Sequence, residues 1–374
     1  MVTQNQEPNC LVVGNYCHDV LIKDDAVLAE SLGGAVSFIS AVLDGLSVPS
    51  QYVAKVGSDF AYPVNHRPMS IPSSKTTLFH AYFSSEIKLQ DRVLKRVTAC
   101  EPIFDSDLSS NAKFNFGMAV GVGGEILPET LEKMIDLCNL VLVDIQALIR
   151  VFDDADGKVR QVDLKETEFY RLLPKIGVLK ASSEEAPYVD VEEARKWCCV
   201  VVTNGKDGCT VYWKDGELQI APFPTVQVDP TGAGDSFLGG FVAGLVHGLS
   251  VPDAALLGNF FGSLTVGQLG LPKFDLRILQ SVKNELDRRS LDFPGFPKRQ
   301  DNMLKFAKSS DHEQFHNALS AAKVVSANPV DNSFWSLSGS PRAVGEQHGH
   351  HHSNGHQNVL VNSVYEAPIK SADT

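Results

Sequence analysis

Asp229-Pro-Thr-Gly-Ala-Gly-Asp235 is the stretch of this 374-residue chain that decides its fold. Asp229 and Thr231 are residue types that commonly cap a helix, and the apolar run after Asp235 predicts that a helix begins here. Because residues 232–234 have small side chains or none, their backbone N–H groups can approach a ligand closely. The first N–H groups of a helix have no partner within it, and the helix dipole adds positive potential. The stretch therefore predicts a binding site for an anion such as a phosphoryl group.

The carboxylate of Asp235 is expected in the first turn of that helix, beside those N–H groups. There it can accept the proton of a hydroxyl group that attacks a phosphoryl group. Positioning and charge stabilisation supply most of the catalysis in phosphoryl transfer, so the base does not have to be strong. An ordinary capped helix after a glycine-rich turn is the alternative, and the complete string with an acid at each end argues against it. The candidate catalytic residues are Gly232, Ala233, Gly234 and Asp235.

The rest of the chain alternates short apolar runs, glycine-containing loops and helical stretches. The runs predict strands at residues 10–14, 51–56, 114–120, 140–144, 176–179 and 198–203, and a hairpin at 210–221. The spacing predicts helices at 35–46, from about 128, and at 183–189. Residues 76–83 and 88–98 alternate in polarity, which is typical of an antiparallel ribbon with one exposed face. This pattern predicts an α/β fold with a mostly parallel sheet, whose ligands lie at the carboxyl ends of the strands.

Composition limits the possible partners and compartment. The formal net charge is -12, so nucleic acid and anionic membranes are not expected as partners. The chain contains no apolar stretch of about 18 residues and no signal-peptide core, so a membrane span is not expected. The seven cysteines match no zinc or disulfide spacing and are expected to be reduced thiols. We therefore expect a cytoplasmic protein.

Several ordered motifs between about residues 10 and 290 resemble the PfkB-type, or ribokinase-like, carbohydrate kinases. The resemblance implies a three-layer α/β/α fold with a mostly parallel central sheet and a small β lid. It divides the chain into an N-terminal extension (1–9), a kinase domain (10–296) and a C-terminal extension (297–374) that is largely disordered from about residue 326. The lid strands are expected at about 16–24 and 75–99.

The same resemblance implies the roles of individual residues. Gly232, Ala233 and Gly234 match the family's anion hole, and Asp235 matches its catalytic base. The expected substrate-binding residues are Asp19, Asn15, Gly33, Gly34 and Ser37. The expected ATP-binding residues are Ser182, Thr203, Gly205, Gly208, Thr231, Gly232, Ala233, Gly234 and Asn259. ATP is the expected co-substrate and Mg²⁺ the expected cofactor, and family members are monomers or weak dimers.

The chain also departs from the family's motifs. Ser182 replaces the Asn of an Asn-x-x-Glu motif, although Glu185 is kept and can hold Mg²⁺ through water. Asp144-Ile-Gln146 replaces an Asp-x-Asn pattern, and Phe38 replaces an Asn that binds furanoses. Tyr62 stands where a Gly often follows Asp59. These departures resemble one branch, the plant myo-inositol kinases, which implies phosphorylation of myo-inositol to the 3-phosphate for phytate synthesis.

Two alternatives remain open. One is another kinase of the same fold, such as a fructokinase, ribokinase or nucleoside kinase, although Phe38 argues against a sugar kinase. The other is a non-catalytic, kinase-like scaffold or regulatory subunit, although the expected base and anion hole are intact. A dinucleotide-binding fold is disfavoured because Gly121-Val-Gly-Gly124 lacks the third glycine of that loop; in a kinase this loop borders the substrate.

Overall fold

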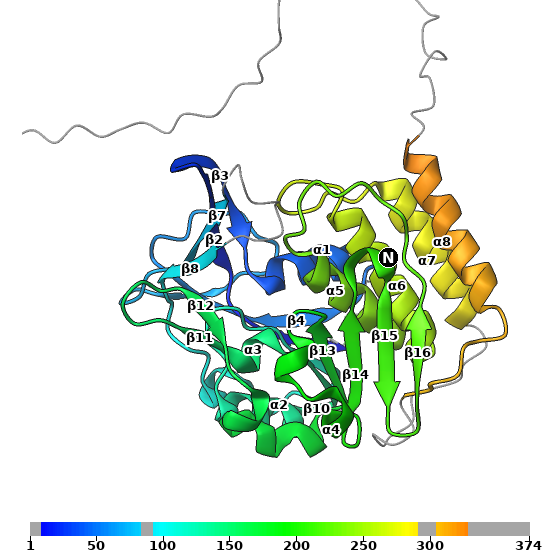
Figure 1. Ribbon diagram of the computed structural model, residues 1–374, viewed down its shortest axis with the longest axis horizontal. Coiled ribbons are helices and arrows are strands. Elements are labelled where there is room, and N and C mark those ends of the chain that lie inside the picture. The colour runs from blue at the N-terminus through cyan, green and yellow to red at the C-terminus, as the bar shows by residue number, and fades with distance from the viewer. Residues whose placement is uncertain (1–8, 84–92, 291–303, 328–374) are drawn as a thin grey trace, which may run out of the picture. The chain divides into compact units, whose positions relative to one another are not determined.

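A large sheet lies at the centre of the computed structural model, which describes residues 9–83, 93–290 and 304–327 (Figure 1). The strands follow the order β16-β15-β14-β13-β10-β9-β1-β4. Six neighbouring strands are parallel: β1 (Cys10–Val13), β4 (Ser50–Val53), β9 (Phe114–Ala119), β10 (Cys138–Asp144), β13 (Val178–Ser182) and β14 (Cys199–Thr203). The hairpin of β15 (Cys209–Trp213) and β16 (Gly216–Ile220) adds two antiparallel strands at one edge. The predicted mostly parallel sheet is confirmed.

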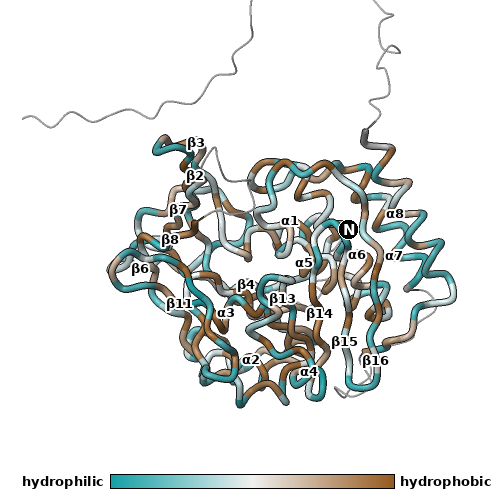
Figure 2. The backbone as a smooth tube through the Cα atoms, in the orientation of Figure 1, coloured by the Kyte–Doolittle hydropathy of each residue, from teal (hydrophilic) through white to brown (hydrophobic). Residues whose placement is uncertain are grey.

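Helices cover both faces of this sheet because its strands are apolar on both sides (Figure 2). In β1, Cys10 and Val12 face one hydrophobic core, while Leu11 and Val13 face a second. The first core is built with α1 (Ala35–Gly45), α5 (Ala233–Val246), α6 (Val251–Thr265), α7 (Leu276–Ser290) and α8 (His312–Ala327). The second is built with α2 (Pro128–Leu137), α3 (Gln146–Ile149) and α4 (Val191–Ala194). Short 3-10 helices lie at Asp105–Asp107, Leu164–Glu166, Glu168–Lys175, Ala186–Tyr188 and Gly205–Asp207.

A second, four-stranded sheet forms the expected lid. Its order is β3-β2-β7-β8, from strands β2 (Cys17–Lys23), β3 (Ala26–Gly33), β7 (Thr77–Phe83) and β8 (Val93–Thr98). Figure 1 shows this lid sheet on the side of the domain opposite to β15 and β16. Two further pairs are β5 (Lys55–Gly57) with β6 (Met69–Ile71), and β11 (Arg150–Phe152) with β12 (Val159–Gln161). The edge strands of the lid sheet, β3 and β8, carry exposed apolar side chains such as Leu28 and Val97.

Three local predictions differ from the structure. The strand predicted at 51–56 divides at Ala54, because β4 joins the main sheet while β5 pairs with β6. The helix predicted at 183–189 is a turn followed by a 3-10 helix. This 3-10 helix ends before Asp190. Asp190 has a left-handed backbone (φ 53°) and is the N-cap of the next helix, α4. Strand β3 was not predicted, since exposed Val27 and Leu28 do not alternate with polar residues.

Helix α8 extends the compact unit beyond residue 296, where the sequence predicts the end of the kinase domain. Phe315 and Leu319 are buried in the first core. His312 lies 2.5 Å from the buried carboxylate of Asp253 on α6. Arg289 of α7 binds Asp311, the residue before α8. The predicted disordered tail lies outside the described residues from 328 onward, and no described helix has the length and apolarity to cross a membrane.

The packing of α8 gives a stability prediction. Phe315→Ala removes a side chain that is 0% exposed, so we expect it to lower the free energy of unfolding by about 3–5 kcal/mol. Chemical denaturation of the full chain measures this change. Val324→Ala is the matched control, because Val324 lies on the same helix and is 60% exposed, and its effect should stay within about 0.5 kcal/mol. Equal stability of the two variants would show that α8 is not part of the cooperative core.

Candidate active site

The stretch from Asp229 to Asp235 forms a turn that feeds helix α5, as predicted. Asp229 caps the turn rather than the helix: its Oδ1 accepts a hydrogen bond from the N–H of Thr231 at 2.9 Å. Gly232 is the helix N-cap, with a left-handed φ of 73° that glycine adopts without strain. Asp235 is in the first turn of α5. The sequence therefore places the carboxylate and the start of the helix together.

Two glycines in this stretch are required by close neighbours. A Cβ atom on Gly232 would lie 2.0 Å from the ring of Phe38, which is buried on α1. A Cβ atom on Gly234 would lie 2.9 Å from Nζ of Lys180. The start of α5 is thus held between an aromatic ring and a buried cation.

Lys180 pairs with Asp144 underneath the start of α5. The two residues are register partners on the adjacent strands β13 and β10, and their Nζ–Oδ2 distance is 2.9 Å. Burial raises the pKa of Asp144 to about 6, although Lys180 opposes this shift. Burial alone would lower the pKa of Lys180, but the carboxylates of Asp144, Glu185 and Asp235 raise it. The pair therefore supplies a permanently charged cation beneath the predicted anion hole.

Asp235 is held by Gln146, which is the first residue of α3. The side-chain Nε2 of Gln146 donates to Oδ1 of Asp235 at 3.2 Å. Burial raises the pKa of Asp235, while Lys180, Arg150 and the hydrogen bond from Gln146 lower it. Gln146 is the residue that replaces the Asn of the family's Asp-x-Asn pattern. This replacement therefore contacts the predicted base.

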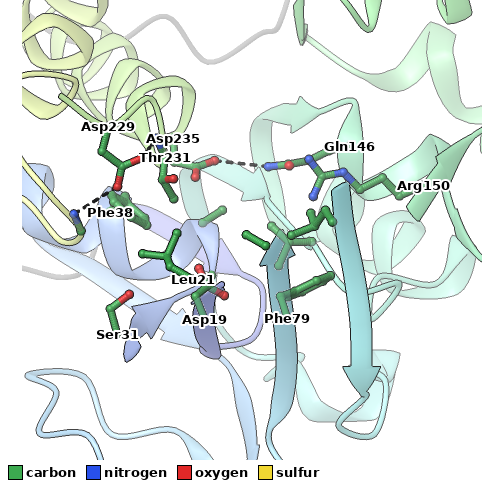
Figure 3. Close-up of a pocket in the computed structure, with 17 residues that line it drawn as sticks. Asp19, Leu21, Ser31, Phe38, Phe79, Gln146, Arg150, Asp229, Thr231 and Asp235 are labelled. Carbon is green, nitrogen blue, oxygen red and sulfur yellow. Dashed lines mark hydrogen bonds between the residues drawn. The ribbon is translucent and has the colours of Figure 1, made fainter. Parts of the chain in front are cut away.

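Asp235 lines a pocket with a volume of about 100 Å³ between α5, α1 and the lid sheet (Figure 3). The polar side chains on its wall are Asp19, Ser31, Gln146, Arg150, Asp229, Thr231 and Asp235. Its apolar lining includes Leu21, Phe38, Phe79, Ala81 and Leu94. Asp19 and Ser31 come from the lid strands β2 and β3, so the lid sheet places a carboxylate and a hydroxyl group in the pocket that holds Asp235.

The two adjacent glycines of the predicted substrate side shape this wall. A Cβ atom on Gly33 would lie 2.1 Å from Oδ2 of Asp19, so only glycine leaves room for that carboxylate. Gly34 has a φ of 85°, and its Cβ would lie 2.4 Å from the backbone oxygen of Asn15. Gly34 lines the pocket itself.

The side chains of Asn15 and Ser37 bind the backbone instead of lining the pocket. Oδ1 of Asn15 accepts from the N–H of Lys55 at 2.7 Å, and Oγ of Ser37 donates to the carbonyl of Gly34 at 2.7 Å. Both residues are buried. They shape the loops around Gly34, and their direct contact with a substrate stays a prediction.

The predicted ATP-binding residues gather at the carboxyl ends of β13 and β14 and on α6. Ser182 ends β13 and forms two bonds with Glu185: its N–H donates to Oε2 of Glu185 at 2.9 Å, and its Oγ accepts from the N–H of Glu185 at 3.2 Å. Thr203 ends β14. Gly205 and Gly208 flank a 3-10 turn, with φ values of 56° and 85°.

Asn259 lies on α6 and ties it to the end of the hairpin. Its Nδ2 donates to the carbonyls of Ile220 and Ala221 at 3.3 and 2.9 Å. The amide thus fixes the segment that follows β16. A direct contact of this side chain with a nucleotide stays a prediction.

Two charged residues of the site, Lys180 and Arg150, were not predicted from the sequence. Lys180 interrupts the apolar strand β13, and a buried charge of this kind needs a partner, which was the available signal. Arg150 follows a four-residue helix that is too short to show a periodicity. Its guanidinium lines the pocket.

Comparison with known proteins places this architecture in a family. The model of the pfkB family carbohydrate kinases matches residues 126–274. A protein of Arabidopsis thaliana named inositol 3-kinase is 59% identical over 316 residues, which cover 84% of this chain and 87% of that protein.

Solved structures share the fold. A pyrophosphate-dependent kinase in the ribokinase family, complexed with a pyrophosphate analog and myo-inositol, has a TM-score of 0.61 and 17% identity, covering 75% of this chain and 99% of the other. A pyrophosphate-dependent myo-inositol-1 kinase, converted into a myo-inositol-3 kinase by two substitutions that introduce leucine, has a TM-score of 0.58 and 18% identity, covering 76% and 99%. These likenesses establish a ribokinase-like fold. The family model and the plant relative show that the chain belongs to the pfkB family of carbohydrate kinases, phosphotransferases that act on an alcohol group.

Proposed function

We propose that this protein transfers the γ-phosphoryl group of ATP to the 3-hydroxyl of myo-inositol, giving myo-inositol 3-phosphate and ADP. The observation that carries the proposal is the position of Asp235, in the first turn of α5 and on the wall of a pocket that the lid sheet covers. The high identity with a plant protein named inositol 3-kinase supports the choice of substrate. We also propose that the product is used in the synthesis of phytate. The enzyme would act in the cytoplasm as a monomer or weak dimer.

The reaction follows from the arrangement of the pocket. The hydroxyl oxygen of the substrate attacks the γ-phosphorus, and Asp235 accepts the hydroxyl proton. The bond from this phosphorus to the β–γ bridging oxygen breaks, and its electron pair leaves with ADP. The backbone N–H groups at Gly232, Ala233 and Gly234 stabilise the charge on the transferred group.

Asp19 and Ser31 are suited to a polyol on the other side of the pocket. A carboxylate can accept hydrogen bonds from two neighbouring hydroxyl groups, and a serine hydroxyl can donate or accept one. Phe38 packs on Gly232 and offers an apolar wall where furanose kinases of the family use an amide. This combination favours a carbocyclic polyol over a furanose.

ATP is proposed to bind across the carboxyl ends of β13 and β14. The supporting features are the hydroxyl groups at the strand ends and the two left-handed glycines. No heavy atom lies within 4 Å of the position of a Cβ on Gly205, so a nucleotide could approach the backbone there. The proposed residues are Ser182, Thr203, Gly205, Gly208, Thr231 and Asn259.

The carboxylate groups around Lys180 fit a magnesium ion that is held through water. Glu185 is buried, and Lys180 and Arg150 counter the effect of burial to hold its pKa below the usual value, so it remains charged. Mg²⁺ commonly keeps several waters and uses one or two protein carboxylates together with substrate phosphates. A bound Mg²⁺ would neutralise charge on the phosphates.

Asp235→Asn tests the proposed base. We expect turnover of myo-inositol with ATP and Mg²⁺ to fall by about 10²- to 10⁴-fold, because the variant cannot accept the proton. Asp136→Asn, an exposed change on α2, is the matched control. A panel of myo-inositol, fructose, ribose and adenosine identifies the preferred acceptor. Unchanged turnover in the variant would exclude this base, and an inactive wild-type protein would favour a scaffold.

Gln146→Met tests the hydrogen bond that holds the base. The bond stabilises the charged form of Asp235, so its loss should raise the pKa of this carboxyl. A bond worth about 1 kcal/mol corresponds to roughly 0.7 pKa unit. Since the base acts only when ionised, the acid limb of the kcat/KM profile should move to higher pH by about that amount. An acid limb that stays in place or moves to lower pH would contradict this role.

Leu94→Asn tests the position of phosphorylation. The 1- and 3-hydroxyls of myo-inositol are mirror-related. A pocket can therefore distinguish them only through its contacts with the other hydroxyl groups, which fix the orientation of the ring. A ring bound in the wrong orientation would bury hydroxyls against the apolar lid wall. We expect Leu94→Asn to lower the preference for the 3-position by about tenfold, measured as the ratio of 3- to 1-phosphate by NMR with a chiral standard. Val97→Asn, an exposed change on the same strand, should leave the ratio unchanged.

A further inference from the structure

Arg150 is a cation in the pocket, and one nitrogen of its side chain has no hydrogen-bond partner among the described residues. It is half-buried at the point where α3 ends and β11 begins. Its side chain lines the pocket together with Gln146 and Asp235 (Figure 3). The Nε atom is buried and has no hydrogen-bond partner among the residues that the structure describes. A guanidinium group stays charged in proteins, so the chain cannot relieve this cost by deprotonation.

The nearby carboxylates do not use these donors. Oδ1 of Asp235 accepts from Gln146, and Oε2 of Glu185 accepts from the N–H of Ser182. The positive charge of Arg150 lowers the pKa of both carboxyl groups. Arg150 therefore adds charge to the cluster, and no described residue accepts a hydrogen bond from its Nε.

We propose that Arg150 is a further catalytic residue, whose guanidinium binds the phosphoryl group during transfer and the phosphate of the product. This inference rests on the proposed function. Guanidinium presents a planar fork of donors that matches two phosphate oxygens, and it is more weakly hydrated than an ammonium group. Arg150 and Gly232, the N-cap residue of α5, line the same pocket, so the transferred group would be bound from two elements.

The position of Arg150 follows from one short connection in the chain. Strand β10 ends at Asp144, α3 begins at Gln146, and Arg150 follows its last turn. Asp144 binds Lys180, Gln146 binds Asp235, and Arg150 lines the pocket. Within seven residues, this connection supplies the ion-pair partner of Lys180, the residue that hydrogen-bonds the proposed base, and the proposed donor to phosphate.

The test compares Arg150→Met and Arg150→Lys with the wild-type chain. We expect Arg150→Met to lower kcat by about 10²- to 10³-fold, as loss of a donor to a developing anion does. The KM for myo-inositol should change less than about twofold, because the free polyol carries no phosphate. Arg150→Lys should recover part of kcat, since it restores the charge without the planar fork. Millimolar guanidinium should also restore activity to Arg150→Ala. Arg160→Met, on the exposed face of β12, is the matched control.

Direct binding and stability separate this proposal from a structural role. Calorimetry should show that Arg150→Met binds inorganic phosphate and myo-inositol 3-phosphate at least tenfold more weakly, with myo-inositol binding unchanged. Its Tm should equal or exceed that of the wild-type chain, because the variant removes a buried donor that has no partner. A variant that unfolds, or one that keeps both kcat and phosphate binding, overturns the proposal.

The same measurements distinguish failure of the proposed role of Arg150 from failure of the proposed function. If the wild-type chain does not phosphorylate myo-inositol, the proposed function is wrong. The phosphate affinities of the wild-type chain and Arg150→Met then still decide whether Arg150 binds phosphate. If the wild-type chain is active and Arg150→Met is equally active, the function stands and the role of Arg150 is rejected.

Discussion

The arrangement of the site depends on a buried charge cluster at the ends of β10 and β13. Asp144, Glu185 and Asp235 are carboxylates in this space, and Lys180 acts on the pKa of all three. Charges removed from water are costly unless they are paired and hydrogen-bonded. Sheet register supplies the first pair, because Asp144 and Lys180 are neighbours on adjacent parallel strands. The helix that carries Asp235 must then begin directly above Lys180.

Close packing links this charge cluster to the residues that are predicted to bind the substrate. Gly232 has to be glycine because the ring of Phe38 lies beside it, and a Cβ atom on Gly234 would lie 2.9 Å from Nζ of Lys180. Phe38 belongs to α1, which begins just after Gly33 and Gly34. These two glycines in turn leave room for the carboxylate of Asp19 and the carbonyl of Asn15. The proposed anion hole and the proposed substrate wall are therefore one packed unit, so a change at Phe38 affects both.

Local sequence predicted the parts of the molecule that depend on local physics. Residues 229–235 specify a turn and a helix start through their capping residues and glycines. Short apolar runs in the sequence predicted the parallel strands. The contacts of Gln146 and Lys180 depend on which strands become neighbours, and no local pattern contains that information. Helix α8 was missed although Phe315, Leu319 and Ala322 have helical spacing, because the apolar pattern breaks before it. Arg150 was missed because α3 is too short to show a period.

The lid sheet completes the site by making one side of the pocket apolar. Leu21, Phe79, Ala81 and Leu94 come from the lid strands and face the same pocket as Asp235. Water is the competing acceptor for a phosphoryl group, and a wall without donors or acceptors gives it few places to bind. The same wall lowers the local dielectric, which strengthens the effect of Lys180 and Arg150 on the base. Burial raises the pKa of Asp235 and these cations oppose the shift, so the proposed base gains proton affinity.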